Sequence, residues 1–234
     1  LHQRVAMYNL IREKKFGVFD GCGTGKTAIG VLSQPLIEKE LKKQGKEFKG
    51  AIIVCPNLAK KAWKKGLIGE DNERNLSEKQ DVIVIDGKIK KDEAFLESLK
   101  NKKWIILNYE QLITKVNGSK KLFFEELINL ESNYVIFDES HHLKSKETET
   151  KTGDKPTISL ASQLLAHNAE YVNLSTGSPI PDGLEDFAVS YSISNPEMCP
   201  DPKKFKELYE GNPRILYTLF NEKSIRRRSE DIND

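Results

Sequence analysis

The sequence has 234 residues, of which 38% are hydrophobic and 31% are charged, and its formal net charge is +2. These values are typical of a globular chain that can bury a full core, with room for one large domain or two small ones. We expect no membrane-spanning segment, because no apolar run approaches the roughly 18 residues that such a segment needs. The small net charge does not argue for nucleic-acid binding by itself, although a near-neutral total can hide a local basic face.

The three cysteines, Cys22, Cys55 and Cys199, are an odd and scattered set without the spacing of metal ligands. We interpret them as reduced thiols in a reducing compartment. No signal peptide is visible at the start of the sequence. We therefore expect an intracellular protein.

Short apolar runs alternate with segments of helical periodicity along the chain. Near-continuous apolar runs predict buried strands at 17–19, 51–55, 82–85, 104–107, 134–137 and 171–174. Helical spacing predicts helices at 3–14, 26–44, 58–67, 92–99, 122–130 and 158–167, and Pro35 is expected to kink or split the second of them. The alternation predicts an α/β fold with a mostly parallel sheet covered by helices on both faces. Ligands bind at the carboxyl ends of such strands, so we expect the loops after Phe19, Phe137 and Leu174 on one edge.

The first chemical motif is the octapeptide Asp20-Gly21-Cys22-Gly23-Thr24-Gly25-Lys26-Thr27, between an apolar run and a helical segment. A glycine-rich turn there lets backbone N–H groups approach an anion, and the new helix adds its own N–H groups and its dipole. The motif predicts a P-loop that binds the phosphates of a nucleotide through Gly21, Gly23, Thr24 and Gly25. Lys26 is expected to reach the β/γ-phosphates and the Thr27 hydroxyl to hold Mg²⁺. Asp20 stands where the strict pattern has glycine.

The second motif is Asp138-Glu139, directly after the predicted strand at 134–137. Two adjacent carboxylates repel each other unless a cation compensates, which favours a magnesium site over a plain helix cap. We expect Asp138 to orient the Mg²⁺ shell and Glu139 to polarise the attacking water as a base. His141 follows two residues later, and we interpret it as a γ-phosphate sensor or coupling residue rather than a structural histidine.

Two further stretches have weaker signals. Thr176-Gly177-Ser178-Pro179 follows the last predicted strand, and we favour a coupling role for Thr176 and Ser178 over a plain loop. A short helical segment around Trp63 has four lysines: Lys60, Lys61, Lys64 and Lys65. These lysines form either a solvated face or a contact with a nucleic-acid backbone. The run of arginines at 226–228 allows the same two interpretations.

These motifs, in this order, resemble those of superfamily 2 helicases and translocases, and within that group they look most like the SWI/SNF-type ATPases. In that family the nucleotide loop often begins with Asp, which accounts for Asp20. Residues 138–141 are similar to the DEAH-type box, with Ser140 in place of alanine, and 174–180 resemble the Leu-Thr-Gly-Thr-Pro-Ile coupling motif. Further matches are Pro56 with Trp63, the tripeptide 108–110, and the basic run at 225–232, which resembles the run that closes the first motor lobe.

The resemblance implies that residues 1–234 form a single RecA-like lobe that binds ATP and Mg²⁺, with Gln3 as the reader of the adenine base. It implies a DNA-dependent ATPase, expected to be a double-stranded DNA translocase that hydrolyses ATP to ADP and phosphate. Family members carry arginine fingers on a second RecA-like lobe in cis, so we expect the lobe alone to be nearly inactive. The lack of a long insertion favours a compact protein in the cytoplasm of a bacterium or of a phage-infected host cell.

Two other functions stay open at this stage. The first is a helicase that separates strands of DNA or RNA. The second is a nucleotide-gated scaffold that binds DNA without hydrolysing ATP, although an intact Asp138-Glu139 pair argues against it.

Overall fold

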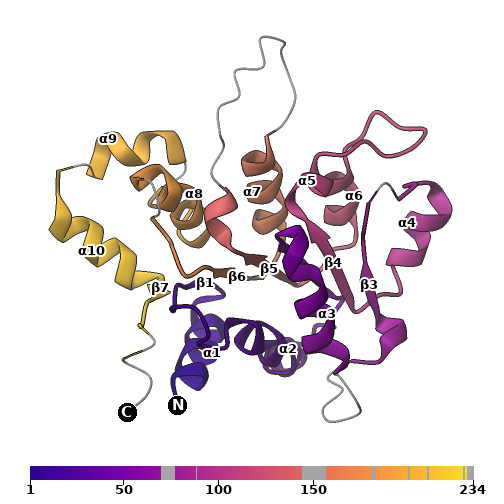
Figure 1. Ribbon diagram of the computed structural model, residues 1–234, viewed down its shortest axis with the longest axis horizontal. Coiled ribbons are helices and arrows are strands. Elements are labelled where there is room, and N and C mark those ends of the chain that lie inside the picture. The colour runs from indigo at the N-terminus through magenta and orange to yellow at the C-terminus, as the bar shows by residue number, and fades with distance from the viewer. Residues whose placement is uncertain are drawn as a thin grey trace.

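The computed structural model describes residues 1–69, 77–87, 89–143, 157–180, 183–199, 201–209, 211–228 and 230. Within these residues, seven strands form one parallel sheet with the order β3-β4-β2-β5-β6-β1-β7 (Figure 1). The strands are β1 (Lys15–Val18), β2 (Ala51–Cys55), β3 (Val82–Val84), β4 (Trp104–Asn108), β5 (Tyr134–Asp138), β6 (Tyr171–Ser175) and β7 (Ser224–Ile225).

The connections between the strands are mostly helical. The α-helices are α1 (His2–Glu13), α2 (Lys26–Lys43), α3 (Lys60–Ile68), α4 (Glu93–Leu99), α5 (Tyr109–Leu112), α6 (Phe123–Asn129), α7 (Ile158–Asn168), α8 (Leu184–Ser194), α9 (Phe205–Tyr209) and α10 (Pro213–Glu222). Short 3₁₀ helices are η1 (Asn57–Ala59), η2 (Lys79–Asp81), η3 (Ser140–Leu143) and η4 (Pro202–Lys204).

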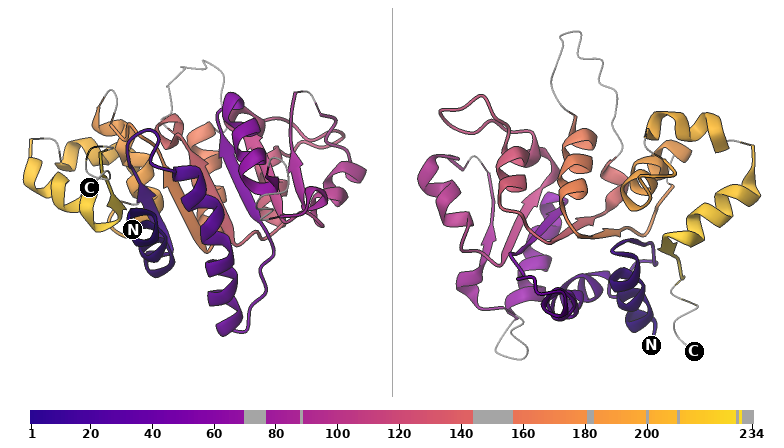
Figure 2. Two further views of the ribbon diagram at one scale, coloured as in Figure 1. Left: turned by 60° about the horizontal axis from the view of Figure 1, so that its bottom comes forward. Right: turned by 180° about the vertical axis from the view of Figure 1, so that it is seen from behind.

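Helices cover both faces of the sheet. Helices α1, α2 and α3 lie on one face and α4 to α8 on the other, which the two views of Figure 2 show from different sides. The side chains of each strand alternate between the two faces. In β2, for example, Ile52 and Val54 pack into the core beneath α4 to α8, while Ile53 and Cys55 pack into the core beneath α1 to α3. Burial on both faces is why the strands read as continuous apolar runs.

The expected α/β fold is confirmed, and the six predicted strands are present within a residue or two of the expected bounds. Pro35 lies inside α2 without splitting it, so the expected split is wrong, and the alternative of a kink stays a prediction. Strand β7 was not predicted, because it has two residues and lies next to a basic run. Of that run, the structure describes residues 225–228 and 230. Among the described residues no helix has the length and apolarity that a membrane crossing requires.

The order of the strands brings three loops together. Strands β5, β6 and β1 are neighbours, and their register aligns Asp138 with Ser175 and Ser175 with Val18. All three strands are parallel, so the loops that follow them begin at the same edge of the sheet. The P-loop, the acidic pair and the segment after Ser175 therefore meet, as the sequence predicts.

Candidate nucleotide-binding site

The loop from Asp20 to Lys26 connects β1 to α2 and depends on two left-handed glycines. Gly23 has φ 78° and Gly25 has φ 82°, a region that side chains with a Cβ rarely adopt. A Cβ on Gly25 would also lie 2.2 Å from the Gln3 side-chain nitrogen. Gly25 is the N-cap of α2, and no side chain caps the first N–H groups of the helix. The turn therefore offers unpaired N–H donors and the positive end of the dipole, which suits the phosphates of a nucleotide.

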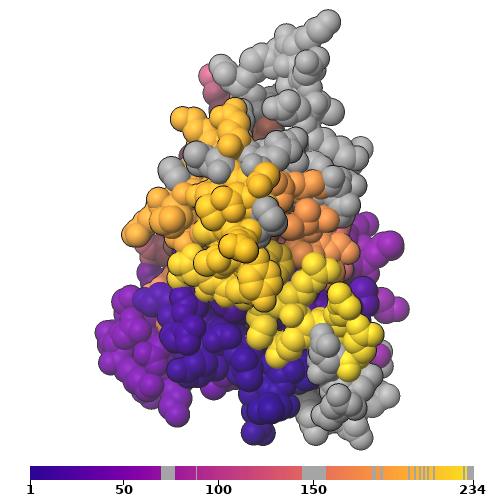
Figure 3. Space-filling model, turned by 90° about the vertical axis from the view of Figure 1, so that its left-hand side faces the viewer, coloured from indigo at the N-terminus to yellow at the C-terminus, as the bar shows by residue number. Residues whose placement is uncertain are grey.

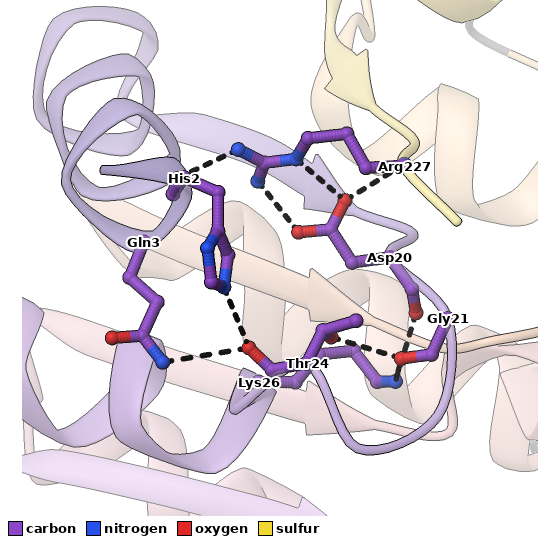
Figure 4. A network of polar contacts seen from close by, with 7 residues as sticks. All are labelled: His2, Gln3, Asp20, Gly21, Thr24, Lys26 and Arg227. Atoms are coloured by element: carbon purple, nitrogen blue, oxygen red, sulfur yellow. Dashed lines mark hydrogen bonds and ion pairs between the residues drawn. The ribbon is translucent and has the colours of Figure 1, made fainter. Parts of the chain in front are cut away.

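Lys26 and Thr24 shape the inside of this loop (Figure 4). The Lys26 ammonium donates hydrogen bonds to the carbonyl oxygens of Asp20 and Gly21, each at 2.8 Å. The Thr24 hydroxyl is buried and donates to the Gly21 carbonyl at 2.9 Å. The Thr24 side chain therefore holds the turn together, and the expected contact of Thr24 with a nucleotide is left to its backbone N–H.

Residues of α1 lie against the other side of the loop. The Gln3 amide donates to the Thr24 carbonyl at 3.4 Å, and the His2 ring Nε2 lies 3.0 Å from the same oxygen (Figure 4). Gln3 is thus next to the phosphate loop, on the side where the new helix begins. Its expected role as the reader of the adenine base stays a prediction.

Asp138 ends strand β5, and both of its carboxylate oxygens accept hydrogen bonds. Oδ2 accepts the indole N–H of Trp63 at 2.7 Å, and Oδ1 accepts the backbone N–H of Glu139 at 3.1 Å. The Tyr109 hydroxyl donates to the Asp138 carbonyl at 2.7 Å. Burial raises the pKa of Asp138 above its ordinary value; the charge of Glu139 adds to this rise, while the Trp63 bond and the charge of Lys26 oppose it.

The sequence indicates Trp63 only as a match to a family motif. The structure shows that its fully buried ring fixes the orientation of Asp138. The sequence signal that could have indicated this role is the tryptophan itself, because a buried indole N–H usually finds a hydrogen-bond partner. Gly30 makes room for this ring, since a Cβ there would lie 2.8 Å from it.

Glu139, His141 and Thr176 form one hydrogen-bonded cluster with Thr176 at its centre. The buried Thr176 hydroxyl donates to Glu139 Oε2 at 3.0 Å, and His141 Nδ1 lies 2.9 Å from the same hydroxyl. A hydroxyl has one proton to donate, so His141 Nδ1 carries a proton and donates to Thr176. Ser178 joins through its backbone N–H, which donates to Thr176 at 3.1 Å. Glu139 itself has φ 50°, a strained conformation typical of functional turns.

The four lysines around Trp63 do not form a single exposed face. Lys60 is buried, and its ammonium donates to the Ile85 carbonyl at 2.7 Å and pairs with Asp86 at 3.2 Å. Lys60 therefore anchors α3 to the end of β3, and its prediction as a nucleic-acid contact does not fit the structure. Lys61, Lys64 and Lys65 are exposed, and their contact with a nucleic acid stays a prediction.

The described residues bring no three histidine, cysteine or acidic side chains together as a metal centre of their own. A nucleotide-bound Mg²⁺ needs only one or two protein carboxylates or hydroxyls, because phosphates and water complete its shell. Suitable groups for such a shared site are Asp138 and Thr27. The charge of Lys26 acts on Asp138, and Thr27 lies in the first turn of α2.

A parallel sheet with a P-loop after β1 and an acidic pair at the end of β5 defines a RecA-like nucleotide-binding domain. The family described as Type III restriction enzyme, res subunit (ResIII) matches residues 1–177, and the chain belongs to this family.

Among curated proteins, the chain is 24% identical over 196 residues to the DNA repair protein rhp54 of Schizosaccharomyces pombe. It is 26% identical over 199 residues to the DNA repair and recombination protein RAD54B of Gallus gallus. These alignments cover 82% and 84% of the chain, which spans 21% and 19% of the length of the two relatives.

Solved structures show the same fold. The Sulfolobus solfataricus SWI2/SNF2 ATPase core in complex with dsDNA matches with a TM-score of 0.68 and 19% identity, over 100% of this chain and 46% of that one. The Pyrococcus furiosus Hef helicase domain matches with a TM-score of 0.55 and 14% identity, over 99% and 39% of the two chains. Together with the relatives, they confirm the resemblance to superfamily 2 ATPases of the SWI/SNF type.

Proposed function

We propose that this chain is the ATP-binding lobe of a DNA-dependent ATPase, a double-stranded DNA translocase that hydrolyses ATP to ADP and phosphate. The observation that carries the proposal is the hydrogen bond from Thr176 to Glu139. This bond connects Glu139, the side chain best placed to activate water, to the loop that follows the neighbouring strand β6. A change around the γ-phosphate at Glu139 and His141 therefore reaches residues 176–178 through direct bonds.

Within this proposal, each site residue has a distinct role. The N–H groups of the loop at Gly23, Thr24 and Gly25 bind the phosphates, and Lys26 leaves the two carbonyls to reach the β/γ-phosphates. The predicted phosphate contact of Gly21 does not fit the structure, because the Gly21 N–H already donates to the Arg227 carbonyl at 2.9 Å. Thr27 and Asp138 hold Mg²⁺, which neutralises charge on the phosphate oxygens. Glu139 accepts the proton of the attacking water, and Gln3 binds the adenine base.

DNA as the partner is supported by the names of the relatives, which are DNA repair proteins, and by the archaeal structure in complex with dsDNA. A second RecA-like lobe in cis is supported by the partial cover of these longer chains. An arginine supplied by such a lobe is worth about 10³–10⁵ in rate in related enzymes, so the lobe alone is expected to turn over slowly. The bacterial or phage origin stays a prediction, since the curated relatives above are eukaryotic.

Single-turnover hydrolysis of Mg²⁺-ATP by the chain tests the proposal, with duplex DNA, single-stranded DNA or RNA added. We expect slow hydrolysis that duplex DNA stimulates most, and stimulation by RNA or by single strands alone would favour a strand-separating helicase instead. Glu139→Gln should abolish hydrolysis and retain ATP binding, while Glu97→Gln, an exposed change on α4, should behave as wild type. Unchanged hydrolysis in Glu139→Gln would remove Glu139 from the mechanism.

The same assay, together with a measurement of DNA binding with and without nucleotide, separates the other candidates. Nucleotide-dependent DNA binding with hydrolysis no faster than in Glu139→Gln would support a non-hydrolysing scaffold. A fast rate from the chain by itself would contradict the need for a second lobe.

A further inference from the structure

We propose that Arg227 is a positioning residue of the phosphate-binding loop, and that nucleotide binding at the loop is thereby coupled to the chain segment after β7. The two regions are 207 residues apart in sequence. The tertiary fold brings them together because β7 pairs with β1 in parallel, Gly17 beside Ser224 and Val18 beside Ile225. Figure 3 shows residues near the C-terminus lying against residues near the N-terminus on this side of the molecule.

Arg227 donates three hydrogen bonds to the Asp20 carboxylate (Figure 4). Its backbone N–H and its Nε donate to Oδ1 at 2.9 Å and 3.0 Å, and its Nη2 donates to Oδ2 at 2.5 Å. The Asp20 side chain is 0% exposed and that of Arg227 is 17% exposed. A buried carboxylate is costly without a partner, and a forked guanidinium satisfies both of its oxygens in one geometry. This pair therefore fixes the position where β1 ends and the loop begins.

The remaining bonds of Arg227 extend the contact to both sides of the loop. Its carbonyl accepts the N–H of Gly21 at 2.9 Å, and its Nη1 donates to the His2 carbonyl at 2.7 Å. The His2 ring in turn contacts the Thr24 carbonyl at 3.0 Å. Arg227, His2, Thr24 and Gly21 thus close a ring of contacts around the loop, with one residue from α1 and one from the segment after β7.

Arg227 and Lys26 contact the same two residues through different groups: Arg227 binds the Asp20 carboxylate and the Gly21 N–H, and Lys26 binds their carbonyl oxygens. Under the proposed function, on which this inference rests, Lys26 turns from these carbonyls to a phosphate, and the first turn of the loop loses two hydrogen bonds. The contacts of Arg227 with Asp20 and Gly21 then remain, together with the bond from the Thr24 hydroxyl to the Gly21 carbonyl, and keep the first turn in place. Arg227 acts on affinity through the loop, without touching the nucleotide.

This arrangement also gives a reason for aspartate at a position where the strict P-loop pattern has glycine. A glycine at position 20 would offer Arg227 no carboxylate. The coupling works in both directions, because linkage between two sites is reciprocal. If Arg227 stabilises the nucleotide-binding form of the loop, a bound nucleotide stabilises the segment around Arg227 by the same factor.

The test compares Arg227→Lys with two matched controls, Arg226→Lys and Arg228→Lys, whose parent residues are both exposed. Lysine keeps the charge but cannot make the forked contact. Binding of a fluorescent N-methylanthraniloyl ATP with Mg²⁺ is titrated well below the melting temperature of each variant. We expect Arg227→Lys to bind at least about tenfold more weakly than wild type, and both controls to bind as wild type. A purely structural role would lower the melting temperature and leave the Kd unchanged, which would overturn the inference.

Hydrogen exchange on the wild-type chain provides a second test that needs no variant. Addition of the same nucleotide should slow exchange in the peptides that contain Gly21 and residues 223–228. If Arg227→Lys fails to fold, this measurement decides, and unchanged exchange at 223–228 on nucleotide binding overturns the inference. A wild-type chain that binds no nucleotide overturns the proposed function together with the inference. Binding that depends on Lys26 but not on Arg227 overturns the inference alone.

Discussion

Trp63 offers the most direct test of how the site is held in shape. Its indole N–H donates to Asp138 Oδ2 at 2.7 Å, and its ring is 1% exposed. Trp63→Phe removes the donor and keeps an aromatic ring in the space beside Gly30. We expect the variant to lose stability and to bind Mg²⁺-nucleotide more weakly, because Asp138 loses the bond that sets its orientation.

The size of the effect follows from the kind of bond. A hydrogen bond to a charged group contributes about 1.5–3 kcal/mol, and an outer-shell partner of a metal ligand is typically worth about 10–100-fold in metal affinity or activity. The smaller ring adds a packing loss that must be subtracted. Trp104→Phe supplies that correction, because Trp104 is also 1% exposed and its indole nitrogen has no hydrogen-bond partner within the described residues.

Two measurements on both variants separate packing from orientation. Urea unfolding gives the free energy of unfolding, and titration with fluorescent ATP at fixed Mg²⁺ gives the nucleotide affinity. Both variants should lose stability, with the larger loss in Trp63→Phe, whereas only Trp63→Phe should lose affinity, by about 10–100-fold. Equal affinities in the two variants would refute the claim that Trp63 positions Asp138.

Two further predictions concern the loop itself. Cys22 is exposed, whereas Cys55 and Cys199 are buried, and burial raises the pKa of Cys55 to about 12 and that of Cys199 to about 11. Iodoacetamide at pH 8 should therefore modify Cys22 alone, at a rate that Mg²⁺-ATP slows. Equal labelling of Cys55, measured by mass spectrometry, would contradict this prediction. Gly23→Ala and Gly25→Ala both place a Cβ at positive φ, but only the Cβ at position 25 would meet Gln3. Gly25→Ala should therefore bind ATP more weakly than Gly23→Ala, and adding Gln3→Ala should lower the affinity further only in the Gly23→Ala chain. Equal affinities of the two glycine variants would show that the contact with Gln3 does not matter.

Much of the fold and of the site could be predicted from local sequence. Strands such as Ala51–Cys55 are buried on both faces, so their apolar runs mark them without knowledge of their neighbours. The P-loop and the acidic pair are recognisable because their chemistry requires glycines, a lysine and carboxylates at short spacing. Parallel strands place such motifs on one edge, so the meeting of the P-loop with Asp138 and Thr176 also followed from the pattern.

The partners of the individual side chains could not be predicted in this way. Lys60 and Lys64 look alike in a lysine-rich helix, but the turn of α3 against β3 buries the ammonium of Lys60 and leaves Lys64 exposed. Trp63 reaches Asp138 across 75 residues of sequence. The burial of a polar group depends on which elements pack over it, and that is a property of the whole fold.

Asp20 shows where the two sources of information divide. The local sequence predicts a phosphate-binding loop, and it shows that the first residue of the loop departs from the strict motif. The partner of Asp20 depends on the whole fold, because β7 pairs with β1 and thereby places Arg227 beside the Asp20 carboxylate. A charge buried at the start of the loop is stable only with that distant arginine, and no local pattern around residue 20 contains it.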